Sequence, residues 1–211
     1  MKIIDVKSTT FKEVKVIRFQ RFTDNRGYFT ETYRKSDFQK NPMLKFLRNK
    51  YFVQTNASYS RNKVIRGLHF QFNPYMDKLV RTVRGRMVDL FLDIRIGSPT
   101  FGKIAAQEMS TEYDKYFNRW IWIPNGFAHG SFFTKDTMIV YYCTGEYSLK
   151  NEVCISPLSE DIDWSLCNKR LKKEFDNLKS SNLIISSKDK KGLSLEQWKN
   201  DKRSKFFIYK K

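Results

Sequence analysis

The feature that most constrains the fold is a close series of short segments in which apolar and polar residues alternate. The series runs from residue 52 to residue 144, and turn residues such as Gly97, Ser98 and Pro99 separate its members. A period of two places successive side chains on opposite faces of a strand. Short, regular strands joined by turns are typical of β-sandwiches and β-barrels. The sequence therefore predicts a mainly β fold, and the absence of long helices between the strands disfavours an α/β sheet.

The same pattern gives the expected elements and the domain organisation. Strands are predicted at residues 14–19, 52–58, 64–72, 79–83, 87–96, 104–109, 119–123, 127–133 and 138–144. Helices are predicted near 169–179 and 195–201, and at 35–49, where Pro42 interrupts the pattern. A length of 211 residues suits one domain with a sizeable core. We expect a single domain over 1–211, with its core within about 1–190 and a basic C-terminal extension over 191–211.

Charge narrows the possible ligands. The chain has 40 Lys and Arg against 22 Asp and Glu, a formal net charge of +18, and much of the excess lies in the last third. Such a surplus attracts nucleic acid, membrane headgroups or phosphorylated small molecules, although scattered surface lysines are usually only solvated. No apolar run is long enough for a membrane span, and the N-terminus lacks the apolar core of a signal peptide. We therefore expect a cytoplasmic protein with no membrane partner.

Residues that bind metals are few and widely spaced. Cys143, Cys154 and Cys167 are an odd set without a CxxC pair, which argues against a disulfide framework and against a zinc site. The two histidines, His69 and His129, lie far apart in the sequence, and a catalytic metal needs three or more converging ligands. We expect no metal.

Two polar stripes with a period of two interrupt the aromatic β pattern. The residues that share one face of their strand are Gly67, His69 and Gln71 in one stripe, and Gln54, Asn56, Ser58 and Ser60 in the other. Either both stripes line a wet binding cavity inside the β structure, or they face solvent at a strand edge. His129 follows a Pro-Asn-Gly turn, so it either points into such a cavity or is satisfied by hydrogen bonds in the wall.

Eight segments, in order along the chain, carry a resemblance to a known family. They are FTDNRGYFTETY (22–33), QTNASYS (54–60), VIRGLHFQ (64–71), KLVRTVRG (78–85), VDLFLDIRIGSPTFG (88–102), WIPNGFAHG (122–130), YYCTGEYS (141–148) and SSKD (186–189). With these segments the chain resembles the dTDP-4-dehydrorhamnose 3,5-epimerase family of nucleotide-sugar epimerases. The resemblance implies a cupin jelly-roll β-sandwich or barrel with a few short peripheral helices. It also implies a homodimeric isomerase of surface polysaccharide biosynthesis that works without a cofactor.

The resemblance also implies roles for individual residues. His69 matches the general base, Asp189 its carboxylate partner and Tyr141 the proton donor. Tyr147 is implied to stack on the nucleobase of the substrate, a nucleoside-diphosphate 4-keto sugar. The other positions implied to contact the substrate are Arg26, Glu31, Gln54, Asn56, Arg66, Lys78, His129, Glu152 and Lys188. Arg26, Phe29 and Glu31 lie in a segment that is implied to act in the neighbouring subunit's site.

The implied reaction gives these residue types a chemical reason. A 4-keto group acidifies the hydrogens on C3 and C5, and a histidine is a suitable base near neutral pH. A carboxylate such as Asp189 fixes the tautomer and stabilises the imidazolium. Lys78 can stabilise the enolate oxygen, and Tyr141 can return a proton to the opposite face. Arginines clamp a diphosphate well, which suits Arg26 and Arg66.

The sequence leaves other functions and the exact substrate open. A sugar 3,4-ketoisomerase shares the cupin architecture and also moves protons beside a ketone. A nucleic-acid-binding protein would use the charge of +18, but the chain has no recognisable nucleic-acid motif, so we expect no such partner. The nucleotide (dTDP or GDP), the sugar (hexose or heptose) and the inverted centre (C3, C5 or both) are not determined. Departures from the family pattern, such as Glu146 and Ser165, leave the proton-transfer residues in place.

Overall fold

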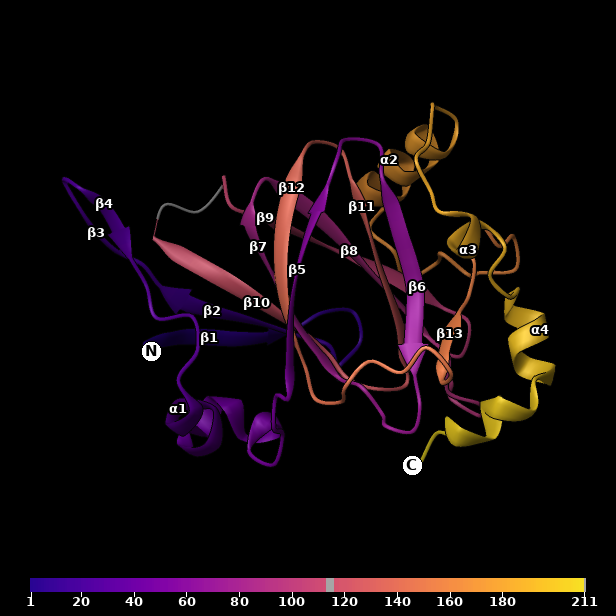
Figure 1. The fold of residues 1–211 in the computed structure, drawn as a ribbon, viewed down its shortest axis with the longest axis horizontal. Coiled ribbons are helices and arrows are strands. Elements are labelled where there is room, and N and C mark those ends of the chain that lie inside the picture. The colour runs from indigo at the N-terminus through magenta and orange to yellow at the C-terminus, as the bar shows by residue number, and fades with distance from the viewer. Residues whose placement is uncertain (113–115, 211) are drawn as a thin grey trace.

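The computed structural model of the protein describes residues 1–112 and 116–210 and consists mainly of two antiparallel sheets packed as a sandwich (Figure 1). In spatial order, the six-stranded sheet contains β1 (Ile3–Ser8), β2 (Lys15–Gln20), β10 (Phe117–Ile123), β7 (Lys78–Arg84), β12 (Thr137–Cys143) and β5 (Gln54–Ser60). The five-stranded sheet contains β13 (Glu152–Cys154), β6 (Ile65–Gln71), β11 (Phe127–Phe133), β8 (Arg86–Asp93) and β9 (Ile104–Ser110). The predicted mainly β sandwich is confirmed.

Apolar side chains from both sheets fill the space between them. Val80 of β7 and Ile121 of β10 pack in one buried cluster with Met87 and Phe91 of β8. Every residue of β8 is buried, because Leu90 and its alternate neighbours pack in a second cluster on the outer face of the same sheet. The alternation predicted for this strand therefore separates two buried faces instead of a core face from a solvent face.

Short helices cover the outer faces of the sandwich. The outer face of the five-stranded sheet is covered by α2 (Lys169–Lys179), α4 (Leu195–Asn200) and the 3-10 helix η2 (Lys202–Phe206). On the six-stranded sheet the cover is α1 (Lys35–Lys40) and the 3-10 helix η1 (Pro42–Leu47). The helix expected over 35–49 divides at Pro42, which has no amide hydrogen to continue the helical bonds. Within residues 1–112 and 116–210, no helix is long and apolar enough to cross a membrane.

The segment after residue 190 is part of the core. Leu195, Trp198 and Phe207 are buried in the same cluster as the outer face of the five-stranded sheet. The indole Nε1 of Trp198 also donates a hydrogen bond to the carbonyl oxygen of Ile94 at 3.0 Å. The core therefore extends past the boundary expected at about residue 190, because apolar residues are interspersed among the lysines of this basic segment. Residue 211 lies outside the described residues.

Candidate active site

Both polar stripes face the interior of the sandwich. On β5 the residues Gln54, Asn56 and Ser58 are partly buried, whereas the residues that alternate with them are exposed. A cavity of about 580 Å³ is lined by Ser58 and by His69, and a smaller one of about 110 Å³ by Gln54, Asn56 and again His69. The stripes therefore line an interior cavity, as the first of the two interpretations predicted.

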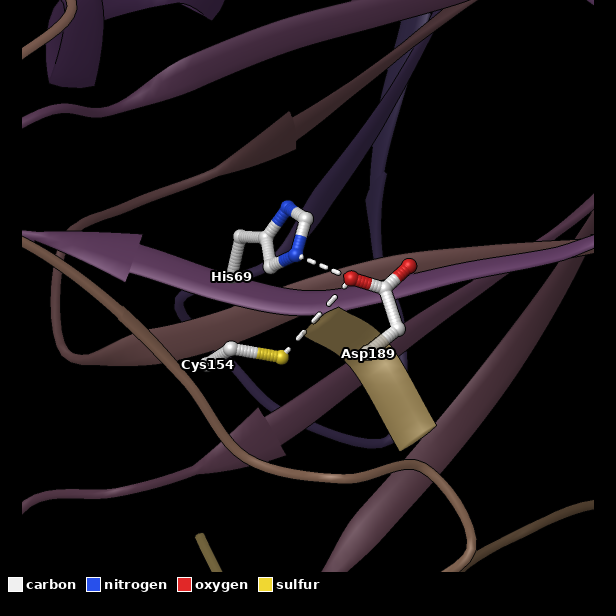
Figure 2. Close-up of side chains that lie close together, drawn as sticks. All are labelled: His69, Cys154 and Asp189. Atoms are coloured by element: carbon white, nitrogen blue, oxygen red, sulfur yellow. Dashed lines mark hydrogen bonds and ion pairs between the residues drawn. The ribbon is translucent and has the colours of Figure 1, made fainter. Parts of the chain in front are cut away.

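A histidine–carboxylate pair lies in the wall of this cavity (Figure 2). His69 Nε2 is 2.8 Å from Asp189 Oδ1, although the two residues are 120 positions apart in the sequence. The second carboxylate oxygen, Oδ2, accepts a hydrogen bond from the backbone N–H of Gly67 at 3.1 Å. Both oxygens of Asp189 are thus engaged, and the carboxylate is held in one orientation against the imidazole.

Local backbone geometry brings Asp189 to β6. Asp189 lies in the short helix α3 (Ser187–Lys190), which Ser186 caps by accepting a hydrogen bond from the Asp189 N–H at 3.0 Å. The preceding Ile184 pairs with the start of β6, since its carbonyl accepts from the Ile65 N–H at 2.9 Å. Gly67 is needed beside β11, because a Cβ there would lie 2.5 Å from the Cα of Gly130. Its φ of +112° also suits glycine.

Hydrogen bonds keep the Asp189 carboxylate ionised and orient the imidazole of His69. Burial alone would raise the pKa of Asp189, but hydrogen bonds from His69, Gly67 and Ser186 hold it below its usual value. An ionised Asp189 accepts the proton on His69 Nε2, which leaves the lone pair on Nδ1. Glu152 Oε1 lies 3.4 Å from Nδ1. Burial opposes ionisation of Glu152 too, yet Lys188 and His69 keep its pKa low.

Tyr141 and Lys78 reach the same cavity from the opposite sheet. Tyr141 is on β12 and Lys78 on β7, which are neighbours in the six-stranded sheet, whereas His69 belongs to the five-stranded sheet. All three side chains line both cavities. Burial is the largest cause that raises the pKa of Tyr141, so the phenol keeps its proton, and burial lowers the pKa of Lys78. A ligand in this cavity meets the imidazole of one sheet and the phenol and amine of the other.

His129 lines the larger cavity and has a partner that sequence reasoning missed. Its Nε2 lies 2.6 Å from Oδ1 of Asp89, a fully buried carboxylate on the adjacent strand β8. Asp89 and Asp93 are the acidic residues of β8, whose other residues after Arg86 are apolar. That pattern is the feature of the sequence that could have identified Asp89.

A second group of predicted residues gathers at the smaller cavity. The hydroxyl of Tyr147 donates to Glu152 Oε2 at 3.0 Å, and its backbone N–H donates to Gln54 Oε1 at 2.8 Å. Glu152 also forms an ion pair with Lys188. Tyr147 is 51% exposed, so its ring is accessible to a ligand. In the larger cavity, Arg66 is held by Ser60, whose Oγ lies 2.9 Å from the guanidinium.

Cys154 is a further residue at the site that the sequence did not mark. It lies opposite His69 in the pairing of β13 with β6, and its Sγ is 4.0 Å from Asp189 Oδ1 (Figure 2). Burial and the charge of Asp189 raise the pKa of this thiol to about 12. All three cysteines of the chain are free thiols.

Comparisons with known proteins identify the family. A family model described as dTDP-4-dehydrorhamnose 3,5-epimerase matches residues 8–197. The chain belongs to this epimerase family. A relative from Sinorhizobium fredii, named dTDP-4-dehydrorhamnose 3,5-epimerase, is 42% identical over 149 residues, which are 69% of this chain and 72% of that protein. A relative of the same name from Neisseria gonorrhoeae is 42% identical over 151 residues, but the match spans 71% of this chain and only 43% of that longer protein.

A solved structure supports the same assignment. The dTDP-6-deoxy-D-glucose-3,5-epimerase of Legionella pneumophila, in complex with dTDP-4-keto-L-rhamnose, superposes with a TM-score of 0.78. The two sequences are 30% identical, and the superposition covers 98% of each chain. The cupin-type sandwich implied by the sequence is thereby confirmed.

Three residues that the family resemblance assigns to the neighbouring subunit's site lie away from this chain's own cavities. Arg26, Phe29 and Glu31 lie on or directly after the hairpin of β3 (Phe22–Asp24) and β4 (Gly27–Phe29), which extends away from the sandwich on the side opposite β13 (Figure 1). Arg26 pairs with Asp24, and Glu31 pairs with Arg34 and with the amino group of Met1. The Phe29 side chain is 66% exposed. None of the three is among the described residues that line the two cavities.

Proposed function

We propose that the chain is an epimerase that inverts C3, C5 or both of a dTDP-linked 4-keto-6-deoxy hexose, in surface polysaccharide biosynthesis and without metal or cofactor. One observation carries the proposal: His69, which is paired with Asp189, and Tyr141 lie on opposite sheets and line one cavity. Inversion of a carbon requires proton removal from one face and proton delivery to the other. Two groups that face each other across a cavity meet that requirement.

The proposed reaction has two proton transfers. Nδ1 of His69 removes the proton on the carbon next to the ketone, and Asp189 stabilises the resulting imidazolium. The electron pair moves to the ketone oxygen, where the ammonium of Lys78 stabilises the enolate. Tyr141 then donates its proton to the opposite face of that carbon, which restores the ketone with inverted configuration. Solvent returns a proton to the phenolate and removes one from the imidazolium.

We assign the nucleotide part of the substrate to the smaller cavity, which Tyr147 lines. Its half-exposed ring offers a stacking surface for a base, and Gln54 and Asn56 offer amide groups for hydrogen bonds. Arg66 and Lys188 line the adjoining cavity and supply positive charge for the diphosphate. A panel of dTDP-, GDP- and UDP-linked 4-keto sugars, each assayed for exchange in heavy water, tests the assignment of dTDP.

Exchange in heavy water separates the roles of the base and the acid. With a dTDP-4-keto-6-deoxy hexose, the wild type should place deuterium at C3 or C5 while the ketone stays at C4. His69→Ala should abolish exchange, and Tyr141→Phe should retain proton removal but lose inversion. Tyr142→Phe is a matched control, because this neighbouring phenol packs on the outer face against Trp120, with ring centroids 5.0 Å apart. A ketone that appears at C3 would contradict the proposal and indicate a ketoisomerase.

We also propose that the chain acts as a homodimer in which Arg26, Phe29 and Glu31 enter the partner's site. The support is a protruding hairpin with exposed aromatic side chains, Phe22, Tyr28 and Phe29, at a distance from its own cavity. Mixing His69→Ala with Arg26→Ala subunits tests it. In a two-fold dimer one intact site forms per mixed dimer, so activity should recover to about a quarter of the wild-type value. No recovery on mixing would show that Arg26 acts within its own chain.

A further inference from the structure

Three side chains of different chemistry, one of them the proposed base, converge in the wall of the proposed site. His69 on β6, Cys154 on β13 and Asp189 on α3 each present one donor atom, and these three atoms lie within 4.8 Å of one another (Figure 2). The histidine and the carboxylate serve the proposed reaction, but the thiol has no part in it. In the described residues this is the one group of three or more His, Cys, Asp or Glu side chains with converging donors.

The spacing of the donor atoms is close to that of a tetrahedral metal site. Bond lengths of about 2.0–2.3 Å to zinc place neighbouring ligand atoms about 3.3–3.6 Å apart. Nε2 of His69 is 2.8 Å from Oδ1 of Asp189, and Sγ of Cys154 is 4.0 Å from the same oxygen. The first distance must lengthen and the second must shorten, each by roughly half an ångström. The distance between Nε2 and Sγ, which lies within 4.8 Å, must fall into the same range. Small side-chain rotations supply such shifts, and the thiol proton leaves when the metal binds.

The charges and the access route also suit a cation. The carboxylates of Asp189 and Glu152 face the imidazole of His69 from two sides, at 2.8 and 3.4 Å. Lys188 is already paired with Glu152, and Lys78, whose Nζ is 3.4 Å from the carbonyl oxygen of His69, lies beside the site as a second cation. His69 and Asp189 line the larger cavity, so an ion from solvent reaches them directly, and a water in the cavity can complete the coordination. Cys154 lies behind them and supplies the thiolate ligand that such an ion prefers.

We propose that His69, Cys154 and Asp189 form a binding site for a thiophilic divalent cation such as Zn²⁺ or Cd²⁺, and that the bound ion inhibits the enzyme. The inhibitory part rests on the proposed function. A metal on Nε2 uses the lone pair of that nitrogen, so the imidazole proton resides on Nδ1. Nδ1 then has no lone pair with which to remove a substrate proton, and Asp189 is bound to the metal instead of the imidazole.

Metal binding is measured without substrate, so that it does not depend on the proposed reaction. Titration of the metal-free protein with Cd²⁺ should produce the ultraviolet charge-transfer absorption of a cadmium thiolate at one equivalent. Cys154→Ser should remove this absorption and weaken Zn²⁺ binding, measured by calorimetry, by roughly tenfold or more. Cys167→Ser is the matched control, because both cysteine residues have an exposed fraction of 9%, and it should behave as the wild type. Zn²⁺ should also raise the melting temperature of the wild type more than that of Cys154→Ala.

Each outcome decides between the alternatives. Wild-type protein that gives no thiolate absorption, or a Cys154→Ser variant that binds Zn²⁺ as tightly as the wild type, overturns the site. Zn²⁺ binding that lacks thiolate absorption places the ion at another donor set, such as His129 with Asp89, and also overturns it. If the site is present and Zn²⁺ inhibits the wild type more strongly than Cys154→Ser, both parts stand. If the thiolate site forms but no 4-keto sugar is a substrate, the metal site stands and the proposed function fails.

Discussion

Replacement of Asp189 by asparagine tests how the carboxylate controls the base. The backbone N–H of Gly67 donates to Oδ2 at 3.1 Å, so an asparagine must place its carbonyl oxygen at that position. Its NH₂ group then faces Nε2 of His69, where the carboxylate now accepts at 2.8 Å. Nε2 becomes a hydrogen-bond acceptor, and the imidazole proton moves to Nδ1. The nitrogen that should remove the substrate proton is thereby blocked.

The expected loss follows from two effects in the same direction. Asp189→Asn favours the wrong tautomer, and it removes the negative charge that stabilises the imidazolium. In histidine–carboxylate pairs of this type the loss of kcat is about 1,000- to 10,000-fold, which corresponds to about 4–5.5 kcal/mol in the activation barrier. KM should change little, because Asp189 is 4% exposed and lies behind the imidazole.

The assay is the rate of deuterium incorporation from heavy water into a dTDP-4-keto-6-deoxy hexose under single-turnover conditions. Circular dichroism and thermal melting check that the variant is folded. Asp163→Asn is a suitable control, because this carboxylate accepts from the Ser165 N–H at a distance from the cavity. If folded Asp189→Asn protein retained activity within about tenfold of the wild type, the tautomer argument would be refuted.

Three further predictions concern the core, the charge network and the enolate site. Trp198→Ala should lower the free energy of unfolding by about 3–5 kcal/mol in urea titrations, since the indole is fully buried; a loss below about 1 kcal/mol would contradict its place in the core. A hydrogen bond from Arg86 holds the pKa of Glu108 at about 2, below its ordinary 4.5, so this pair stabilises the fold fully above pH 4.5 and progressively less as the pH falls towards 2. Glu108→Gln should therefore flatten the dependence of stability on pH in that window, and an unchanged acid-unfolding profile would count against it. Lys78→Met should lower kcat about 100- to 1,000-fold in the exchange assay with nucleotide binding retained, and unchanged turnover would remove Lys78 from the enolate site.

The strands were predictable where one physical pattern dominates. Alternating polarity or short apolar runs between turns located β5 through β12 to within a few residues. The three-residue strand β13 and the four-residue helix α3 were missed. Elements this short carry too few residues to show a period, and they are held by pairing with β6 or by a cap at Ser186.

The candidate site was predictable in part for a similar reason. The stripe of Gln54, Asn56 and Ser58 showed that one face of a strand is polar, and the structure places that face towards the cavity. Asp189 and Cys154 meet His69 only through tertiary contacts, and nothing in their local sequences indicates this. Family resemblance supplied Asp189, whereas Cys154 required the structure.

The separation of His69 from its carboxylate has a consequence for how the protein matures. The two residues are 120 positions apart, and Trp198 and Phe207, which complete the outer core, follow Asp189 in the chain. During synthesis, most strands of both sheets emerge before the residue that activates the base has been made. Pairings over such sequence distances form slowly. An intermediate with a paired sandwich but an undocked C-terminal segment would therefore have most of its strands and no His69–Asp189 pair. On the proposed mechanism, enzymatic competence is then the last property that the folding chain acquires.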